Sequence, residues 1–375
     1  MKCIDEIPAS ELKGKRVLVR SDFNLPLDAK GEVANMFRLK QGWKTIQYLG
    51  ERGARVITVS HIGRDPEETI EPVARAMKQF GNVVFIPDLV GAMARDAAKV
   101  IKDGEIMLLE NVRRDARETE NDESFAKDLA SLAEVYVDDA FAVAHRAHAS
   151  IVGIPKFLPS YTGLLMRDEI REIDAARSPE HPSFAILGGA KFETKAPLVK
   201  LLLEKYEHMF IAGALANDVF KARGFPVGRS LISKESPSED ILSNPRLLAP
   251  IDVTVERSDG QARVKKPDEV EADDKIMDIG PDTVAMLAPH IASAKFILWS
   301  GPTGMYENGY ISWTTALAEL IATSDAKKVI GGGDTIAAIE ATGVPQEKLG
   351  FLSTGGGAML EYLLKGTLPG VEALQ

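Results

Sequence analysis

The sequence predicts two α/β domains, each built on a parallel sheet covered by helices, with one long helix joining them. Short runs of β-branched residues alternate with amphipathic segments along the whole chain, which is typical of such sheets. The chain has 375 residues, enough for two domains of ordinary size. Residues 155–159 are rich in proline and lead into a helix-like segment over 161–177, which Ser178–Pro182 ends.

The first half of the chain contains the clearest alternation. Strands are predicted at Arg16–Arg20, Arg55–Ser60, Asn82–Ile86, Glu105–Glu110 and Val135–Phe141. Helices are predicted near 36–50, 70–80, 89–102 and 121–133, where apolar residues recur at spacings of three and four. The last of these begins with an Asn-Asp capping signal and carries Phe125, Leu129 and Leu132 on one face.

The second half repeats this style without repeating the sequence. Strands are predicted at Phe184–Leu187, Met209–Ala212, Asp252–Glu256, Ile276–Ile279, Phe296–Trp299, Lys328–Ile330 and Leu349–Leu352. Helices are predicted near 195–206, 214–223, 281–292, 313–322 and 334–341. Residues 257–274 are polar and charged, which indicates a hairpin or a loop rather than core.

Composition excludes several classes of protein. There are 55 acidic and 45 basic residues, and this net charge of −10 argues against a nucleic-acid-coating protein. The single cysteine, Cys3, excludes a disulfide framework and a cysteine-based metal site. No apolar run approaches the ~18 residues that span a membrane, and the first residues lack the apolar core of a signal peptide. We therefore expect a cytoplasmic protein without a membrane partner, and nothing requires more than a monomer.

Basic side chains follow several strands of the first half. Ser60-His61-Ile62-Gly63-Arg64 ends one strand, Arg113 follows another, and His145, Arg146 and His148 follow a third. Arg38, at the start of the first helix, can join them. Arginines that converge on one edge of a sheet repel each other unless an anion neutralises them, so this pattern favours a phosphate or carboxylate site. The histidines offer metal ligation as an alternative, which the neighbouring arginines oppose.

The first strand ends in a different kind of motif. Asp22 and Asn24 are two residues apart, just before Pro26, and can both face a polar group such as a hydroxyl. The alternative is an Asx turn, in which both side chains only satisfy backbone groups.

Glycine clusters mark the strand ends of the second half. They are Gly188–Lys191, with Lys195 four residues later on the following helix, Gly331–Thr335, and Ser353–Gly357. Glycines between a strand and a helix let backbone N–H groups approach phosphate, and lysines four apart on a helix share a face. Asp334 can hold Mg²⁺ together with substrate phosphates. The alternative is that these glycines only permit tight turns.

Two common nucleotide motifs are absent. The chain contains neither G-x-x-x-x-G-K-[ST] nor G-x-G-x-x-G, which excludes a P-loop protein and weakens a nicotinamide dehydrogenase hypothesis. An anion-binding half and a half rich in glycine and lysine together suggest phosphoryl transfer between a small acid and a nucleotide.

Eight segments, in this order, resemble the phosphoglycerate kinase family. They are RVLVRSDFNLPL, SHIGR, LLENVR, YVDDAFAVAHRAHAS, ILGGAKFETK, GPTGMYE, VIGGGDT and FLSTGGGAMLEYLLKGTLPGVEAL, which together extend from Arg16 to Leu374. The resemblance implies two Rossmann-like lobes joined by a helix and a hinge. It places a 3-phosphoglycerate-binding domain at 1–160, the connecting helix at 161–177, a nucleotide-binding domain at 178–355, and at 356–375 a segment that returns to the first domain.

The resemblance also implies an activity and a set of site residues. The activity is reversible phosphoryl transfer between 1,3-bisphosphoglycerate and ADP, giving 3-phosphoglycerate and ATP, with Mg²⁺ held by Asp334. The substrate would contact Asp22, Asn24, Arg38, His61, Arg64, Arg113 and Arg146. The nucleotide would contact Gly189, Lys191, Lys195, Glu307, Gly332, Gly333, Asp334 and Thr335. The family pattern makes Arg38, Lys191 and Lys195 catalytic, because they supply positive charge to the transferring group.

Some positions depart from the family pattern. Ser300 and Asp138 stand where asparagine is usual, and Ala142-Val143 replaces a usual Gly-Thr. The segment Gly213–Asn217 lacks a second glycine and a methionine that are common there, and the stretch after Arg64 is short. These departures leave the arginines and lysines intact. A catalytically impaired nucleotide-binding homologue is the alternative that they raise.

Overall fold

The computed structural model describes all 375 residues and divides them into two compact units. The N-terminal unit comprises Met1–Arg171 with Thr367–Gln375, and the C-terminal unit comprises Glu172–Gly366. The division therefore lies inside helix α6 (Leu164–Arg177) and at residue 366, rather than at the predicted boundaries 160, 177 and 355. Helix α13 (Gly357–Lys365) packs against α7 (Phe192–Lys205), which explains why it belongs to the C-terminal unit.

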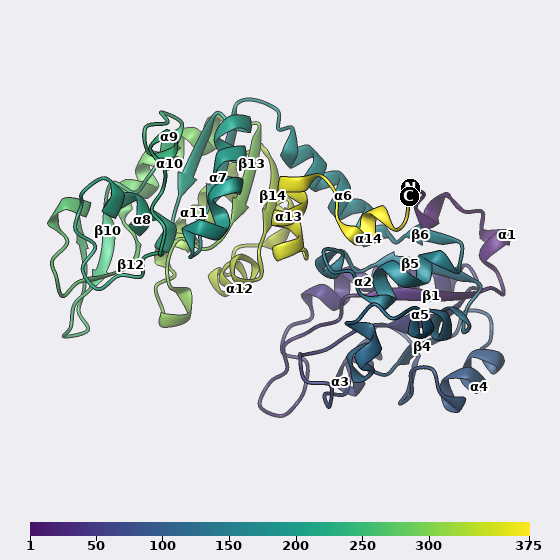
Figure 1. Cartoon of the computed structure of the whole chain (residues 1–375). Helices are drawn as coiled ribbons and strands as arrows, with labels where there is room; N and C mark the ends of the chain where they lie inside the picture. The colour runs from purple at the N-terminus through teal and green to yellow at the C-terminus, as the bar shows by residue number, and fades with distance from the viewer. The chain divides into compact units, whose positions relative to one another are not determined.

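The N-terminal unit contains a parallel sheet of six strands in the order β3-β4-β2-β1-β5-β6 (Figure 1). Its strands are β1 Arg16–Ser21, β2 Arg55–Val59, β3 Val83–Ile86, β4 Ile106–Leu109, β5 Val135–Asp139 and β6 Ser160–Thr162. Its helices besides the first part of α6 are α1 Ala9–Leu12, α2 Phe37–Glu51, α3 Glu71–Met77, α4 Ala92–Val100, α5 Glu123–Ala130 and α14 Pro369–Glu372. Strands β1, β2 and β4 are buried almost throughout, as expected of a sheet covered on both faces.

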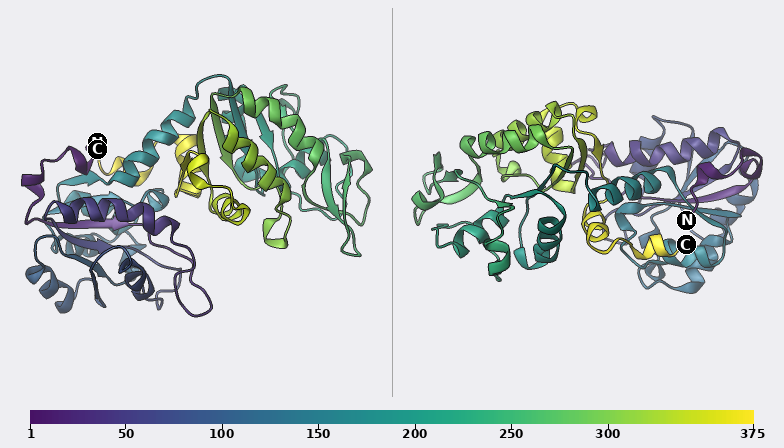
Figure 2. Two further views of the ribbon diagram at one scale, coloured as in Figure 1. Left: turned by 180° about the vertical axis from the view of Figure 1, so that it is seen from behind. Right: turned by 90° about the horizontal axis from the view of Figure 1, so that it is seen from above.

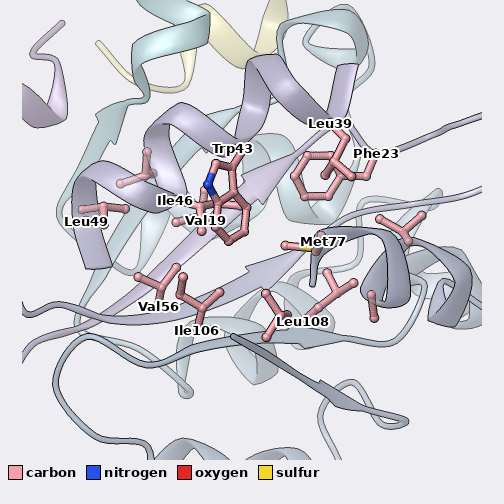
Figure 3. Close-up of a cluster of buried hydrophobic side chains, with 14 of the residues drawn as sticks. Val19, Phe23, Leu39, Trp43, Ile46, Leu49, Val56, Met77, Ile106 and Leu108 are labelled. Carbon is pink, nitrogen blue, oxygen red and sulfur yellow. The ribbon is translucent and has the colours of Figure 1, made fainter. Parts of the chain in front are cut away.

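The core of this unit forms where helix α2 packs on the sheet (Figure 3). Leu39, Trp43, Ile46 and Leu49 recur at spacings of three and four, so they share one face of α2, and all four are buried. Figure 3 shows these side chains directed toward Val19 and other aliphatic residues of the strands. Burying this apolar face fixes α2, and with it Arg38, against the sheet.

The C-terminal unit contains a second parallel sheet of six strands, in the order β15-β14-β13-β7-β8-β9. Its strands are β7 Ser183–Leu187, β8 His208–Ile211, β9 Leu247–Leu248, β13 Phe296–Ser300, β14 Lys327–Gly331 and β15 Phe351–Leu352. Its helices besides α7 and α13 are α8 Ala214–Ala222, α9 Glu239–Leu242, α10 Pro281–Ser293, α11 Ser312–Thr323 and α12 Gly333–Thr342. The predicted fold class, two parallel-sheet α/β domains, is confirmed.

A small antiparallel sheet adds to the C-terminal unit. It joins β10 (Val253–Glu256), β11 (Ala262–Lys265) and β12 (Lys275–Ile279) in the order β11-β10-β12. Of the two alternatives for residues 257–274, a hairpin or a loop, the structure shows a hairpin, in which β11 pairs antiparallel with the preceding β10. The runs at 252–256 and 276–279 are strands as predicted, but they belong to this sheet and not to the parallel one.

The segment that enters α6 differs from its prediction. Residues 160–162 form the edge strand β6, and the helix begins only at Leu164. The reason is a buried cap: Oδ1 of Asp139, at the end of β5, accepts a hydrogen bond from the amide of Met166 at 3.0 Å.

The two ends of the chain lie beside each other in the N-terminal unit (Figure 2). None of the helices combines the length and apolarity needed to cross a membrane.

Candidate active site

The first strand of the N-terminal unit brings a buried carboxylate to the carboxyl edge of the sheet. Asp22 directly follows β1 and is 6% exposed. Its Oδ2 lies 3.0 Å from Nη1 of Arg38, in the first turn of α2. Because a buried carboxylate needs a partner, this ion pair holds the Arg38 guanidinium at the sheet edge. Two predicted site residues from different elements are therefore in direct contact.

Asn24 links two neighbouring loops of this edge. Its side-chain Oδ1 accepts a hydrogen bond from the backbone amide of Gly63 at 2.9 Å. The backbone amide of Asn24 donates to Oδ1 of Asp22 at 3.3 Å. The turn interpretation of this motif is therefore observed. Asp22 differs from Asn24 because it also binds a charged side chain.

Arg20 is a site residue that sequence reasoning missed. It lies inside β1 and is 1% exposed, and its Nε donates to Oγ of Ser150 at 2.8 Å. The Ser150 hydroxyl in turn donates to Oε1 of Glu118 at 2.6 Å. Ser150 is presented by a π-helical turn over Ala149–Gly153, a rare conformation that often occurs at functional sites. The sequence signal was an arginine inside an apolar strand, which must find buried partners.

His61 shows how much positive charge gathers here. Burial lowers its pKa well below the ordinary value, and Arg20, Arg113, Arg146 and Arg38 lower it further. The imidazole is therefore neutral at pH 7, so its contact of 3.6 Å with Asp22 is not an ion pair. Its Nδ1 lies 3.4 Å from Nη2 of Arg20. Four arginines from separate segments thus act on one buried side chain, and the sequence had singled out three of them, Arg38, Arg113 and Arg146.

The other basic residues differ in how firmly they are held. Arg113 is half-buried and donates through Nη1 to the carbonyl of Gly63. Its pKa is lowered by burial and then by Arg146 and Arg20, and the charges of Asp22 and Glu118 offset this only in part. Arg146 and Arg64 are exposed. Arg64 is not among the four arginines that affect the pKa of His61 most.

His145 and His148 lie on the border of this cluster. Burial lowers the pKa of His148 to about 4, and Arg20, Arg146, Arg113 and His145 contribute. Surrounding positive charge of this kind opposes a metal cation, and no three metal-ligating groups gather here. The edge of the sheet is suited to an anion.

The C-terminal unit has a cavity of about 770 Å³ at the ends of its strands. This volume suits a small-molecule ligand. Three predicted nucleotide-binding residues, Gly189, Glu307 and Asp334, line it. Apolar side chains such as Phe220 and Met277 supply much of the remaining wall. Lys191, Lys195, Gly332, Gly333 and Thr335 are not part of the lining.

Two glycines let the strand ends approach each other beside this cavity. A Cβ on Gly301 would lie 2.4 Å from the carbonyl carbon of Gly188, and Gly301 has a φ of +96°. Only glycine fits both conditions at that position. The loops after β7 and β13 are therefore in backbone contact at one side of the cavity.

Lys191 does not lie on a helix as the sequence suggested. It precedes α7 with φ 63° and ψ 77°, a left-handed conformation that costs a non-glycine residue about 1–2 kcal/mol. The expectation that Lys191 and Lys195 share a helix face is therefore wrong. Lys195 lies in the first turn of α7, and burial lowers the pKa of its amine from the ordinary value. Neither amine forms an ion pair.

Thr335 ties two strand ends together. It is fully buried; its Oγ1 accepts from the amide of Gly301 at 2.7 Å and donates to the carbonyl of Gly331 at 2.8 Å. Ser300, the departure in the GPTG segment, is also buried, and a Cβ on Gly332 would lie 3.4 Å from its Oγ. Both hydroxyl residues therefore shape the loops after β13 and β14.

Asp334 has the properties that a magnesium ligand needs. It is exposed in the first turn of α12, lines the cavity and forms no ion pair. Burial raises the pKa of the neighbouring Tyr306, and the charges of Asp334 and Glu307 raise it further. Mg²⁺ usually binds through one or two carboxylates together with substrate phosphates, so this donor fits the ion.

Comparisons with known proteins agree across the whole chain. The family model described as phosphoglycerate kinase matches residues 5–366. The phosphoglycerate kinase of Moorella thermoacetica is 40% identical, covering 97% of each chain. That of Pelotomaculum thermopropionicum is 41% identical, also over 97% of each chain.

Solved structures give the same result. A phosphoglycerate kinase structure from Coxiella burnetii is similar with a TM-score of 0.83 at 34% identity, covering 99% of this chain and 98% of that one. A phosphoglycerate kinase structure from Pyrococcus horikoshii OT3 has a TM-score of 0.89 at 31% identity, covering 100% and 98%. The strand-end arginines, the glycine-lined cavity and these similarities lead to one conclusion: the chain belongs to the phosphoglycerate kinase family.

Proposed function

We propose that this chain catalyses reversible phosphoryl transfer between 1,3-bisphosphoglycerate and Mg-ADP, giving 3-phosphoglycerate and ATP. The observation that carries the proposal is the arginine cluster around His61, in a chain of this family. A group of like charges at one sheet edge is destabilising unless an anion occupies it. A substrate with a phosphate and a carboxylate supplies that anion.

The acid binds at the N-terminal unit in this proposal. Arg38, Arg113 and Arg146 neutralise its phosphate and carboxylate, and the exposed Arg64 joins when substrate is present. Neutral His61 donates a hydrogen bond without adding charge. Asp22 and Asn24 face the hydroxyl group, and Asp22 also keeps Arg38 in place through the ion pair of 3.0 Å.

The nucleotide occupies the cavity of the C-terminal unit. Glu307 binds the ribose hydroxyls, and Gly189, Gly332 and Gly333 offer backbone amides to the phosphates. Thr335 supports this loop from beneath, because its hydroxyl is already committed on both sides. Asp334 holds Mg²⁺, which neutralises charge on the phosphates when bound.

The chemistry needs no general base. In the direction of ATP consumption, a carboxylate oxygen of 3-phosphoglycerate forms a bond to the γ-phosphorus of ATP, and the bond from that phosphorus to the β-phosphate oxygen breaks, leaving ADP. A carboxyl group with an ordinary pKa of ~4 is already ionised at pH 7, so no proton has to move. Catalysis then consists of in-line positioning and charge neutralisation by Arg38, Lys191 and Lys195. Bringing the two substrates together requires hinge closure, which also excludes water.

Binding measurements test the two half-sites separately. Isothermal titration calorimetry with 3-phosphoglycerate should show at least about tenfold weaker binding for Arg113→Ala than for the unchanged protein, because a charge-assisted contact is lost. The affinity for MgADP should stay within about twofold in the same variant. Glu307→Ala should give the opposite pattern. Unaltered binding of 3-phosphoglycerate to Arg113→Ala would contradict the proposed acid site.

The rate of ATP formation separates this function from the alternative, a catalytically impaired homologue, which departures from the family pattern such as Ser300 suggest. An impaired homologue binds MgADP and forms no ATP from 1,3-bisphosphoglycerate, whereas the proposed enzyme forms it. A monomeric state and a cytoplasmic location remain predictions, and sedimentation equilibrium tests the first of them.

A further inference from the structure

A partly buried chain of hydrogen bonds connects helix α8 to the start of helix α7. Asp218, on α8, is 4% exposed, and its carboxylate accepts both the amide and the hydroxyl of Ser233, each at 2.7 Å. The Ser233 Oγ accepts a hydrogen bond from the amide of Phe192 at 2.6 Å. We call Asp218, Ser233 and the Phe192 amide the 218–233 relay.

The relay ends next to the most unusual backbone in this unit. Phe192 is the first residue of α7 and directly follows Lys191, whose φ is +63°. Asn121 is the only other non-glycine residue of the chain with a positive φ. Such conformations persist where the surroundings over-determine them, and they occur often at active sites. The relay is one of the restraints on Lys191.

A second restraint acts on the other side of Lys191. The carbonyl of Gly189 accepts a hydrogen bond from the amide of Leu215, in the first turn of α8, at 3.1 Å. The segment Gly189–Phe192 is thus attached to α8 at two points. Before Lys191, the Gly189 carbonyl binds α8 directly, and after Lys191, the Phe192 amide binds it through Ser233. Helix α8 is buried along most of its length and serves as the rigid support.

The relay depends on a hydrogen-bonding side chain at residue 218. The Ser233 hydroxyl donates its one proton to Oδ2 of Asp218 and accepts the Phe192 amide with one of its two lone pairs. An asparagine at 218 would accept from the Ser233 amide and donate through its NH₂ group to the second lone pair of the hydroxyl, so it would keep Ser233 in place. Alanine at 218 removes both bonds to Ser233 and leaves its hydroxyl without an anchor.

We propose that Asp218 and Ser233 are positioning residues for the phosphoryl transfer, which hold Lys191 and the start of α7 in the orientation that the reaction needs. The proposal rests on the proposed function. Neither residue lines the cavity, and the polar atoms of both side chains are committed to the relay. They act through the backbone of Phe192 and not by contact with the substrates.

Steady-state kinetics of Ser233→Ala, Asp218→Ala and Ser233→Thr test the proposal, with ATP formation as the readout. Displacement of a catalytic group by about 1 Å can reduce turnover by about 100-fold. We expect kcat to fall at least about tenfold in Ser233→Ala and Asp218→Ala, with KM for MgADP within about threefold of the unchanged enzyme. Ser233→Thr retains the hydroxyl and should keep at least about half of kcat.

Asp252→Asn is the matched control. Asp252 is another buried carboxylate of this unit that accepts two amides and a hydroxyl, at the start of α10, and it does not line the cavity. Its variant should lose thermal stability and keep kcat. Equal loss of kcat in Asp252→Asn and Ser233→Ala would show general destabilisation and overturn the proposal. Normal kcat in both Ser233→Ala and Asp218→Ala would overturn it as well.

Hydrogen exchange at the Phe192 amide separates this proposal from the proposed function. Protection in the unchanged protein and its loss in Ser233→Ala would establish the restraint independently of activity. An unprotected Phe192 amide would refute the relay even if the enzyme is active. If one of the variants fails to fold, the other decides, because each breaks the same chain at a different bond.

Discussion

Replacing Asp138 with asparagine should stabilise this protein, and more so as the pH rises. Asp138 is fully buried at the end of β5, where the family usually has asparagine. Its Oδ1 accepts the amide of Ala140 at 3.0 Å, and its Oδ2 has no hydrogen-bond partner. In Asp138→Asn the Oδ1 bond is kept and one polar atom still lacks a partner. The two proteins therefore differ mainly in the buried charge.

The size of the effect follows from the pKa of this carboxyl. Burial raises it from 3.8 to about 7, although Arg20 opposes that increase. The folded state therefore holds a proton between pH 3.8 and about 7 that the unfolded state has already released. Stability falls as pH rises through that window, by about 4 kcal/mol in total, at 1.36 kcal/mol per pH unit. About 3 kcal/mol of the loss falls between pH 5 and pH 8.

Urea unfolding of both proteins at pH 5 and pH 8 measures this difference. The stabilisation by Asp138→Asn should be larger at pH 8 than at pH 5, by up to about 3 kcal/mol. The slope of the unfolding free energy against urea should be the same in both proteins, since the folded structure is unchanged. An equal effect at both pH values, or a loss of stability at pH 8, would refute the reasoning.

Three further predictions concern single groups. The pKa of His148 is about 4 in the folded protein, so below pH 6.5 the unfolded state binds more protons than the folded state. The unfolding free energy should therefore fall as the pH is lowered toward about 4. In His148→Gln, urea unfolding should show a smaller fall over the same pH range. Thr335→Val removes a buried hydroxyl with two partners and should lower the unfolding free energy by about 1–3 kcal/mol, and an unchanged urea midpoint would contradict this role. Asp334→Asn should raise the Mg²⁺ concentration for half-maximal turnover by about tenfold, because one carboxylate ligand is lost, and an unchanged requirement would assign the ion to other residues.

Much of the fold was predictable because strand and helix periodicities are local properties. The strands near Arg16 and Arg55 and the helix near residue 37 lie within one residue of their predicted starts. What local patterns could not predict is the partner of a strand. The run at 253–256 has the same β-branched composition whether it joins a parallel or an antiparallel sheet, so its place in the small sheet became visible only in the structure.

The arginine cluster was predictable for a similar reason, since parallel strands present their carboxyl ends at one edge. That rule identified Arg38, Arg113 and Arg146 together with His61. It missed Arg20, which precedes the strand end and is buried against Ser150. Spacing alone also misjudged Lys191, because a left-handed backbone before α7 has no signature in the neighbouring sequence.

The central claim is that this chain transfers a phosphoryl group with the help of the strand-end arginines. Its most direct test is the initial rate of ATP formation from 1,3-bisphosphoglycerate and MgADP, measured for the unchanged protein, for Arg38→Ala, and for Arg75→Ala as a control. Arg75 is an exposed arginine of the same unit that pairs only with surface carboxylates.

The unchanged protein and Arg75→Ala should both form ATP. Arg38→Ala should lose at least about 100-fold in kcat, since removing one donor of transition-state charge costs about 3 kcal/mol. The change leaves the buried Asp22 without its cation, so the Arg38→Ala protein could lose stability. Circular dichroism is therefore needed to check that this variant is folded. Absence of ATP formation by the unchanged protein, or near-normal turnover by folded Arg38→Ala, would contradict the account.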